Sequence, residues 1–208
     1  MIRRFLLLPC SLLLSSLSAF ATVGGEQHIE VLGYDTQDQK VYVLRHYEDG
    51  RARLPQLYYF DLRSKQNDKL IEVTSIYIDP KTGKADYDNN DVAFNKELHK
   101  IKRRLSSLYP LNPKVFSVQI NQQQQESTPS WHDPNEETIE YHYEYHVHDS
   151  SYQSQPQKAI SYKPELKIKQ AFRIPRQNKI LVTVEYLGIP FESGYSMEDP
   201  ILLSPKTK

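Results

Sequence analysis

Three of the seven histidines in this 208-residue chain lie within residues 138–149, where they alternate with tyrosines and glutamates. Successive side chains of a β-strand point to opposite faces, so this spacing predicts one strand with two different faces. We expect the apolar face to be buried; it carries Ile139, Tyr141, Tyr143, Tyr145 and Val147. The opposite face is the histidine face, which carries Glu140, His142, Glu144, His146 and His148.

The histidine face could bind a metal ion. Two histidines separated by one residue on a strand, such as His146 and His148, can reach the same ion. His142 and Glu144 extend this ligand set, and Glu140 could orient an imidazole ring from outside it. Imidazole and carboxylate ligands without a thiolate favour zinc or copper. A solvated face is the competing interpretation, because any half-exposed strand shows the same alternation.

Aromatic residues provide a second candidate surface. Tyr141, Tyr143 and Tyr145, together with the single tryptophan Trp131, could form a platform on which a carbohydrate or a peptide stacks. In the alternative interpretation the tyrosines pack in the core and keep their hydroxyls at its rim.

An acidic segment resembles part of a calcium-binding loop. Asp86, Asp88, Asn90 and Glu97 occupy its first, third, fifth and twelfth places, but Asp91 stands where the sharp turn requires glycine. Capping of the helix that follows is the favoured interpretation. The basic residues of segment 100–104 lie off the apolar stripe of that helix, which predicts a solvated face.

The N-terminal half predicts four antiparallel strands followed by one helix. Residues 28–34, 40–47, 56–62 and 70–78 are rich in β-formers and are separated by turn residues, which indicates a meander. Residues 41–44 are apolar on both faces, as in a strand covered on two sides. Apolar residues then recur at helical spacing, which predicts one long amphipathic helix that ends at Pro110; they are Phe94, Leu98, Ile101, Leu105 and Leu108.

The C-terminal half predicts further strands at 114–120, 166–173 and 179–187. Residues 121–133 carry four consecutive glutamines and no apolar period, so they predict a polar connecting loop. Gly194 and Pro200 predict an irregular tail. The expected fold is α+β: residues 22–208 form one antiparallel β-rich domain with the helix packed on its sheet.

Residues 1–21 predict a signal peptide. Arg3 and Arg4 precede an apolar run, and Ala19-Phe20-Ala21 is the small-x-small pattern of a cleavage site after Ala21. The run of about 16 residues is shorter than the roughly 20 that a spanning helix needs, and no transmembrane helix is expected in the mature chain. Cys10 raises a lipoprotein alternative, which the preceding Leu7-Leu8-Pro9 disfavours.

The mature composition narrows the function classes. Cleavage removes Arg3, Arg4 and the only cysteine, which leaves 24 basic against 26 acidic residues and no disulfide. This near-neutral charge argues against a nucleic-acid partner. The chain has no Asn-x-Ser/Thr site, so a bacterial periplasmic or secreted location is preferred.

These patterns favour a non-enzymatic binding or interaction protein of the bacterial envelope, with an envelope protein or a glycan as partner. The sequence has no Gly-x-Ser-x-Gly elbow, no phosphate-binding glycine loop and no His-Glu-x-x-His helix. The alternative is a metal-binding protein or metal-dependent hydrolase centred on His142, His146 and His148. A lipid- or glycan-handling protein is a third interpretation, based on the aromatic content alone.

Overall fold

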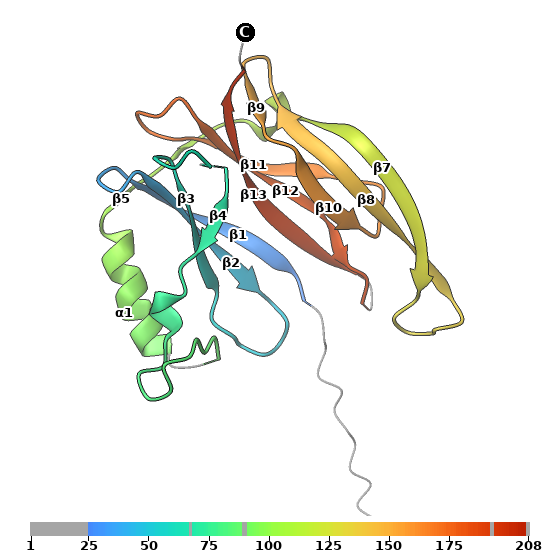
Figure 1. Ribbon diagram of the computed structural model, residues 1–208, viewed down its shortest axis with the longest axis horizontal. Helices are drawn as coiled ribbons and strands as arrows, with labels where there is room; N and C mark the ends of the chain where they lie inside the picture. The colour runs from blue at the N-terminus through green and yellow to red at the C-terminus, as the bar shows by residue number, and fades with distance from the viewer. Residues whose placement is uncertain (1–24, 67, 89–90, 192–193, 207–208) are drawn as a thin grey trace, which may run out of the picture.

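The computed structural model describes residues 25–66, 68–88, 91–191 and 194–206. The predicted signal peptide and Asn90 of the calcium-like segment lie outside these residues. The described chain is mostly antiparallel β-structure with one α-helix, which confirms the predicted β-rich α+β class (Figure 1). Within it, no helix is both long and apolar enough to cross a membrane.

The first sheet is the predicted meander with one added strand. Its strands have the order β4-β3-β2-β1-β5. Their bounds are Gln27–Asp35 (β1), Lys40–Tyr47 (β2), Gln56–Asp61 (β3), Leu70–Glu72 (β4) and Leu105–Ser106 (β5). β4 is shorter than predicted, because a 3₁₀-helix, η1 (Ser75–Tyr77), follows it.

The second sheet contains the remaining eight strands, in the order β10-β8-β9-β13-β12-β11-β6, with β7 paired to β8. A second 3₁₀-helix, η2 (Pro113–Val115), precedes β7. The strand bounds are Tyr109–Pro110 (β6), Ser117–Pro129 (β7), Glu137–His148 (β8), Tyr152–Ser154 (β9), Gln157–Ser161 (β10), Lys167–Arg173 (β11), Ile180–Ile189 (β12) and Tyr195–Pro205 (β13).

Two predictions for this half of the chain were wrong. Residues 121–129 of the glutamine-rich connector are not a loop, because residues 117–129 form β7 and pair with β8; only residues 130–133 of the connector lie in the turn between the two strands. The tail is not irregular either, because β13 pairs with β12. Pro200 is tolerated there since β9 pairs only with the end of β13, from Leu203 onward, which leaves Pro200 at an edge position.

The strands and the helix stack in four layers, which lie side by side in Figure 1. Helix α1 (Asp91–Lys102) covers the outer face of the first sheet, where Phe94 and Leu98 pack against Tyr42 and Leu44. The other face of the first sheet packs on β11–β13. The second sheet turns back on itself at β9, so its strands β7, β8 and β10 cover the far side of β11–β13.

The middle strands are therefore buried on both faces. On β2, Val41 and Val43 face β11–β13 while Tyr42 and Leu44 face the helix, as predicted. On β12, Leu181 lies in the core shared with the first sheet, and Val182 lies in the core shared with β8. The central position of β12 explains its nearly continuous apolar sequence.

The helix is shorter than predicted and has 12 residues. The apolar stripe continues beyond Lys102, but Leu105 lies in β5 and pairs with Asp35 of β1, and Leu108 enters the core between the sheets. The apolar spacing predicted the buried face of the helix correctly. It predicted the C-terminal end wrongly, because strand pairing replaces the helix at Leu105.

Candidate functional site

Strand β8 has the two predicted faces. Tyr143, Tyr145 and Val147 are buried in the core against β12 and β13. All five residues of the histidine face are partly exposed. Alternation along the sequence thus identified the buried face over Tyr143–Val147. The prediction was wrong for Ile139, which is 45% exposed, and Tyr141 is half-buried.

Two neighbouring strands extend the histidine face into a wider surface. Glu144 lies between Gln122 of β7 and Lys158 of β10, and His142 lies between Gln124 and Ile160 in the next row. In a third row, Glu126 pairs with Glu140, and the Tyr162 hydroxyl donates to Glu140 Oε1 at 2.8 Å. These three rows form the polar platform, which consists of Gln122, Gln124, Glu126, Glu140, His142, Glu144, Lys158, Ile160 and Tyr162.

A β-bulge in β7 decides which residues join the platform. Ile120 pairs with Tyr145 and Gln122 with Glu144, so Asn121 is an extra residue between them. An extra residue reverses the alternation of the strand beyond it. Without the bulge, Glu126 would lie on the same face as Tyr141 and Tyr143. With the bulge, Glu126 pairs with Glu140 and lies on the histidine face.

Three potential metal ligands converge on the platform. His142 Nε2 lies 3.1 Å from Glu140 Oε2 and 3.6 Å from Glu126 Oε2. The three ligand atoms all lie within 4.8 Å of one another. Burial and the hydrogen bond to Glu140 raise the pKa of Tyr162 to about 12, so its hydroxyl remains a donor at neutral pH.

The other predicted metal ligands lie elsewhere on β8. His146 Nδ1 contacts Asn121 Oδ1 at 3.0 Å, and its ring centroid lies 5.6 Å from that of His148. Burial, together with the charges of His148 and Lys206, lowers the pKa of His146. Glu144 lines the surface hollow described in the next paragraph. Of the four predicted ligands, only His142 belongs to the converging group found in the described chain, and sequence reasoning missed Glu126 as a member of it.

A surface hollow of about 600 Å³ is lined by residues of the platform and by residues from the core-facing side of β8 and β10 and from β12 and β13. Its wall combines amide, carboxylate, imidazole and ammonium groups with apolar side chains. The lining residues are Gln122, Gln124, His142, Tyr143, Glu144, Lys158, Ala159, Ile160, Tyr186, Gly188 and Met197. Hollows of this size with a few polar groups are typical of small-ligand sites.

The predicted aromatic surface is largely buried. The side chains of Tyr143 and Tyr145 are only 5% and 1% exposed, so they do not form an exposed stacking platform, although Tyr143 borders the hollow. Tyr141 is half-buried and stacks on Tyr143. Trp131 is exposed and meets Phe191 edge-on, with ring centroids 5.6 Å apart. The core-packing interpretation of the tyrosines therefore describes Tyr143 and Tyr145.

The β7–β8 turn contains a hydrogen-bonded chain that the sequence analysis did not identify. Ser130 Oγ lies 2.6 Å from His132 Nδ1, and His132 Nε2 lies 2.8 Å from Glu136 Oε2. Serine, histidine and carboxylate occur in this order in hydrolytic triads. Here Ser130 is buried and its backbone N–H donates to the Glu136 carbonyl, so we interpret the chain as closing the turn.

The acidic segment before α1 is occupied by local contacts. The backbone N–H of Asp88 donates to Asp86 Oδ1 at 3.0 Å, and Asp91 begins the helix. The turn at Asp86 and the acidic Asp91 in the first turn of the helix agree with the turn and helix-dipole interpretation. The other predicted cap, Asn90, lies outside the described residues. At the other end of the helix, Lys100 pairs with Glu97 and Lys102 with Glu30.

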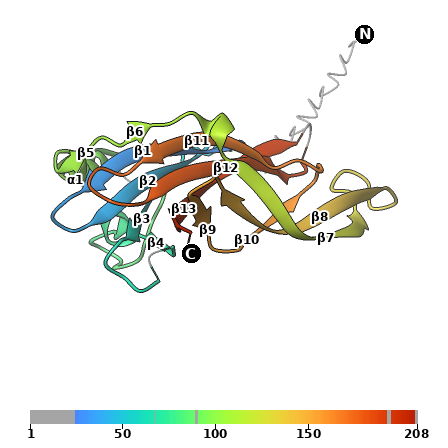
Figure 2. The ribbon, with the colours of Figure 1, turned by 90° about the horizontal axis from the view of Figure 1, so that it is seen from above.

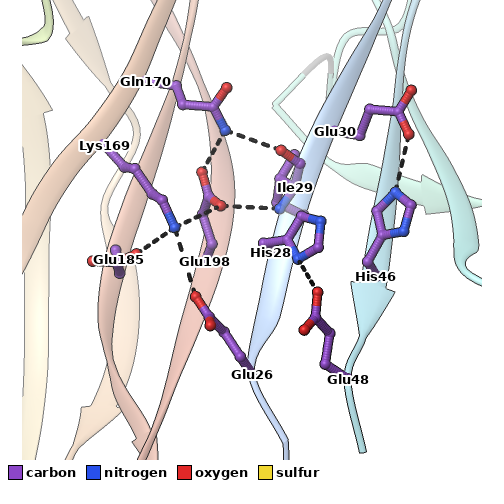
Figure 3. A network of polar contacts seen from close by, with 10 residues as sticks. All are labelled: Glu26, His28, Ile29, Glu30, His46, Glu48, Lys169, Gln170, Glu185 and Glu198. Carbon is purple, nitrogen blue, oxygen red and sulfur yellow. Dashed lines mark hydrogen bonds and ion pairs between the residues drawn. The ribbon is translucent and has the colours of Figure 1, made fainter.

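A second polar cluster joins the two sheets (Figure 3). Glu198 of β13 is 1% exposed and accepts hydrogen bonds from the backbone N–H of Ile29 and the amide of Gln170. The same amide also donates to the Ile29 carbonyl, so two side chains satisfy the polar groups of β1 at Ile29. Lys169 lies 3.6 Å from Glu198 and 2.5 Å from Glu185. Because every member has a partner, we interpret this cluster as structural.

Figure 3 also shows two cross-strand histidines on the first sheet. The rings of His28 and His46 are stacked, with centroids 4.6 Å apart, and each faces its own carboxylate. His28 lies 3.5 Å from Glu48, and His46 lies 3.0 Å from Glu30. Hydrogen bonds from Lys102 and His46 lower the pKa of Glu30 although burial opposes them.

No protein-family model, curated protein or solved structure matches the chain. The arrangement of its own residues is therefore the basis for a functional proposal.

Proposed function

We propose that this chain is an exported protein of the bacterial envelope that binds a glycan at the polar platform and does not catalyse a reaction. The surface hollow carries this proposal, because its volume of about 600 Å³ suits a small ligand or one unit of a polymer. A periplasmic or secreted location, after cleavage near Ala21, would expose the platform to the glycans of the envelope. An envelope protein is the other partner that this location permits.

The chemistry of the platform supports a glycan. Sugar hydroxyls both donate and accept hydrogen bonds, and the amides of Gln122 and Gln124 can do the same. Lys158 adds a donor and Glu144 an acceptor. Ile160, which is 45% exposed, offers an apolar contact for the face of a sugar ring.

Cosedimentation with purified peptidoglycan tests the proposal. We expect the protein purified from the periplasm to sediment with peptidoglycan, and the double variant Gln122→Ala, Lys158→Ala to bind at least tenfold more weakly. The matched control is Asn95→Ala, Lys96→Ala, which changes two exposed residues of α1 and should bind like the wild type. A wild-type protein that stays in the supernatant, or a platform variant that sediments normally, would contradict the proposal.

A metal-dependent hydrolase is the second candidate function, favoured by the convergence of Glu126, Glu140 and His142. Three protein ligands with an open fourth position are typical of catalytic zinc sites. His142 also lines the hollow, so a ligand there would lie beside the ion. Zinc-dependent release of soluble fragments from peptidoglycan in the same assay, lost in His142→Gln, would replace the binding proposal with this one.

A further inference from the structure

We propose that Glu126, Glu140 and His142 bind one zinc ion at the end of the polar platform. This inference rests on the proposed function, because both take the polar platform as the binding surface. The zinc ion would lie beside the hollow. The ligand set differs from the one that the sequence predicted, since it replaces His146, His148 and Glu144 with two glutamates from paired strands.

Backbone pairing fixes the positions of the three ligands. Glu126 and Glu140 are direct cross-strand partners, and His142 lies two residues further along the same face of β8. Zinc bonds of about 2.0–2.2 Å in tetrahedral geometry place neighbouring ligand atoms about 3.3 Å apart. The observed distances from His142 Nε2, 3.1 Å to Glu140 and 3.6 Å to Glu126, lie on either side of this value.

The charge of the site favours a dication. Like charges directly opposite each other on paired strands destabilise the pairing. In the described part of the chain, neither Glu126 nor Glu140 forms an ion pair with a lysine or arginine, and His142 is their shared partner. A bound dication would replace repulsion between the carboxylates with attraction to a common centre.

Tyr162 supports the site from outside the ligand set. Its hydroxyl donates to Glu140 Oε1 at 2.8 Å and leaves Oε2 directed at His142. The backbone N–H of Tyr162 donates to the Leu187 carbonyl of β12, which anchors the donor to the neighbouring layer. Hydrogen bonds of this kind orient carboxylate ligands and raise metal affinity.

The donor types are compatible with zinc, and the spacing along β8 limits which residues can bind the same ion. One imidazole and two carboxylates without a thiolate suit zinc. The side chain of Glu126 is 67% exposed, so the site is open on one side and water can complete the coordination. His146 lies four residues from His142, about 13 Å along a strand, and cannot share this ion.

Zinc content measured by mass spectrometry after equilibrium dialysis tests the inference. We expect one zinc per chain in tag-free protein, and at least a tenfold loss of affinity in Glu126→Gln and in His142→Gln. The matched control is the double variant His146→Ala, His148→Ala, which removes two histidines of the same strand and should keep the wild-type affinity. Thermal unfolding without zinc would confirm that each variant is folded.

Three results would overturn the zinc site: no zinc in the wild type, full zinc in Glu126→Gln and His142→Gln, or loss of zinc in the His146, His148 control. Peptidoglycan cosedimentation of the same samples separates this inference from the proposed function. Protein that sediments normally but binds no zinc contradicts the metal site alone, and protein that binds zinc but does not sediment contradicts the glycan proposal alone.

Discussion

At the scale of single residues, Glu198 is a buried carboxylate that links the two sheets. Its carboxylate accepts hydrogen bonds from Ile29 and Gln170 and lies near Lys169. The hydrogen bond from Lys169 to Glu185 and the charge of Glu198 raise the pKa of Lys169, although burial, the largest effect, opposes them. Lys169 therefore stays charged at neutral pH. Removing Glu198 would leave the Ile29 N–H without its acceptor, whereas Lys169 keeps Glu185 and Gln170 keeps the Ile29 carbonyl.

We expect Glu198→Ala to lower the free energy of unfolding by about 2–3 kcal/mol, because the buried N–H of Ile29 loses its acceptor and the Gln170 amide loses one of its two. Glu185→Ala is the matched control: it removes another carboxylate in contact with Lys169, but one with a side chain 26% exposed. Its loss should cost about 0.5 kcal/mol. Urea denaturation at pH 7 measures both values, and equal losses would show that Glu198 has no special role.

The residue scale also shows what the sequence could and could not predict. The alternation of histidine and tyrosine on β8 is a local pattern, so its two faces were predictable. Glu126 could not be assigned to the site, because its face depends on the bulge at Asn121 and on pairing with β8. The role of Glu198 could not be predicted either, because its hydrogen-bond partner Ile29 is 169 residues away in the sequence.

At the scale of elements, the two main errors have one physical cause. The residues of β7 are mostly exposed, so no burial period marks them as a strand, and pairing with β8 supplies the structure. Leu105 has helical spacing from Leu98 and Ile101 but pairs with β1. In both segments a long-range strand pairing overrides the local pattern.

Gly33 explains how β5 can approach β1 after the helix ends. Its φ is 145°, and a Cβ atom there would lie 2.8 Å from the Ser106 carbonyl oxygen and 2.9 Å from Leu105 Cβ. We therefore expect Gly33→Ala to destabilise the fold by about 2–3 kcal/mol through strain and overlap.

The matched control for Gly33 is Gly83→Ala, which has a φ of 68° and no atom within 4 Å of the added Cβ. It carries backbone strain without overlap and should cost about 1 kcal/mol. Thermal and urea unfolding of both variants provide the comparison. A Gly33→Ala protein as stable as the wild type would show that β5 is not held closely against β1.

At the scale of the whole molecule, polar contacts on β13 join the first sheet to the second. Asp199 Oδ1 lies 2.6 Å from Arg45 of β2, and Asp199 Oδ2 accepts a hydrogen bond from Tyr186. With Glu198 on the neighbouring position, β13 contacts both β1 and β2 through charged side chains. The platform lies on the opposite side of β11–β13, and its hairpin projects beyond the other strands (Figure 2).

Export is the prediction that concerns the chain as a whole. The described contacts begin at Gly25 and Glu26: a Cβ on Gly25 would lie 2.2 Å from the Glu48 carbonyl oxygen, and the Glu48 N–H donates to Glu26. Cleavage after Ala21 would therefore leave every described contact intact. We expect N-terminal sequencing of periplasmic protein to begin at Thr22. We also expect Ala21→Arg to accumulate the uncleaved precursor, because the peptidase requires a small residue there. An intact Met1 terminus in the cytoplasmic fraction would refute export and, with it, the envelope glycan as ligand.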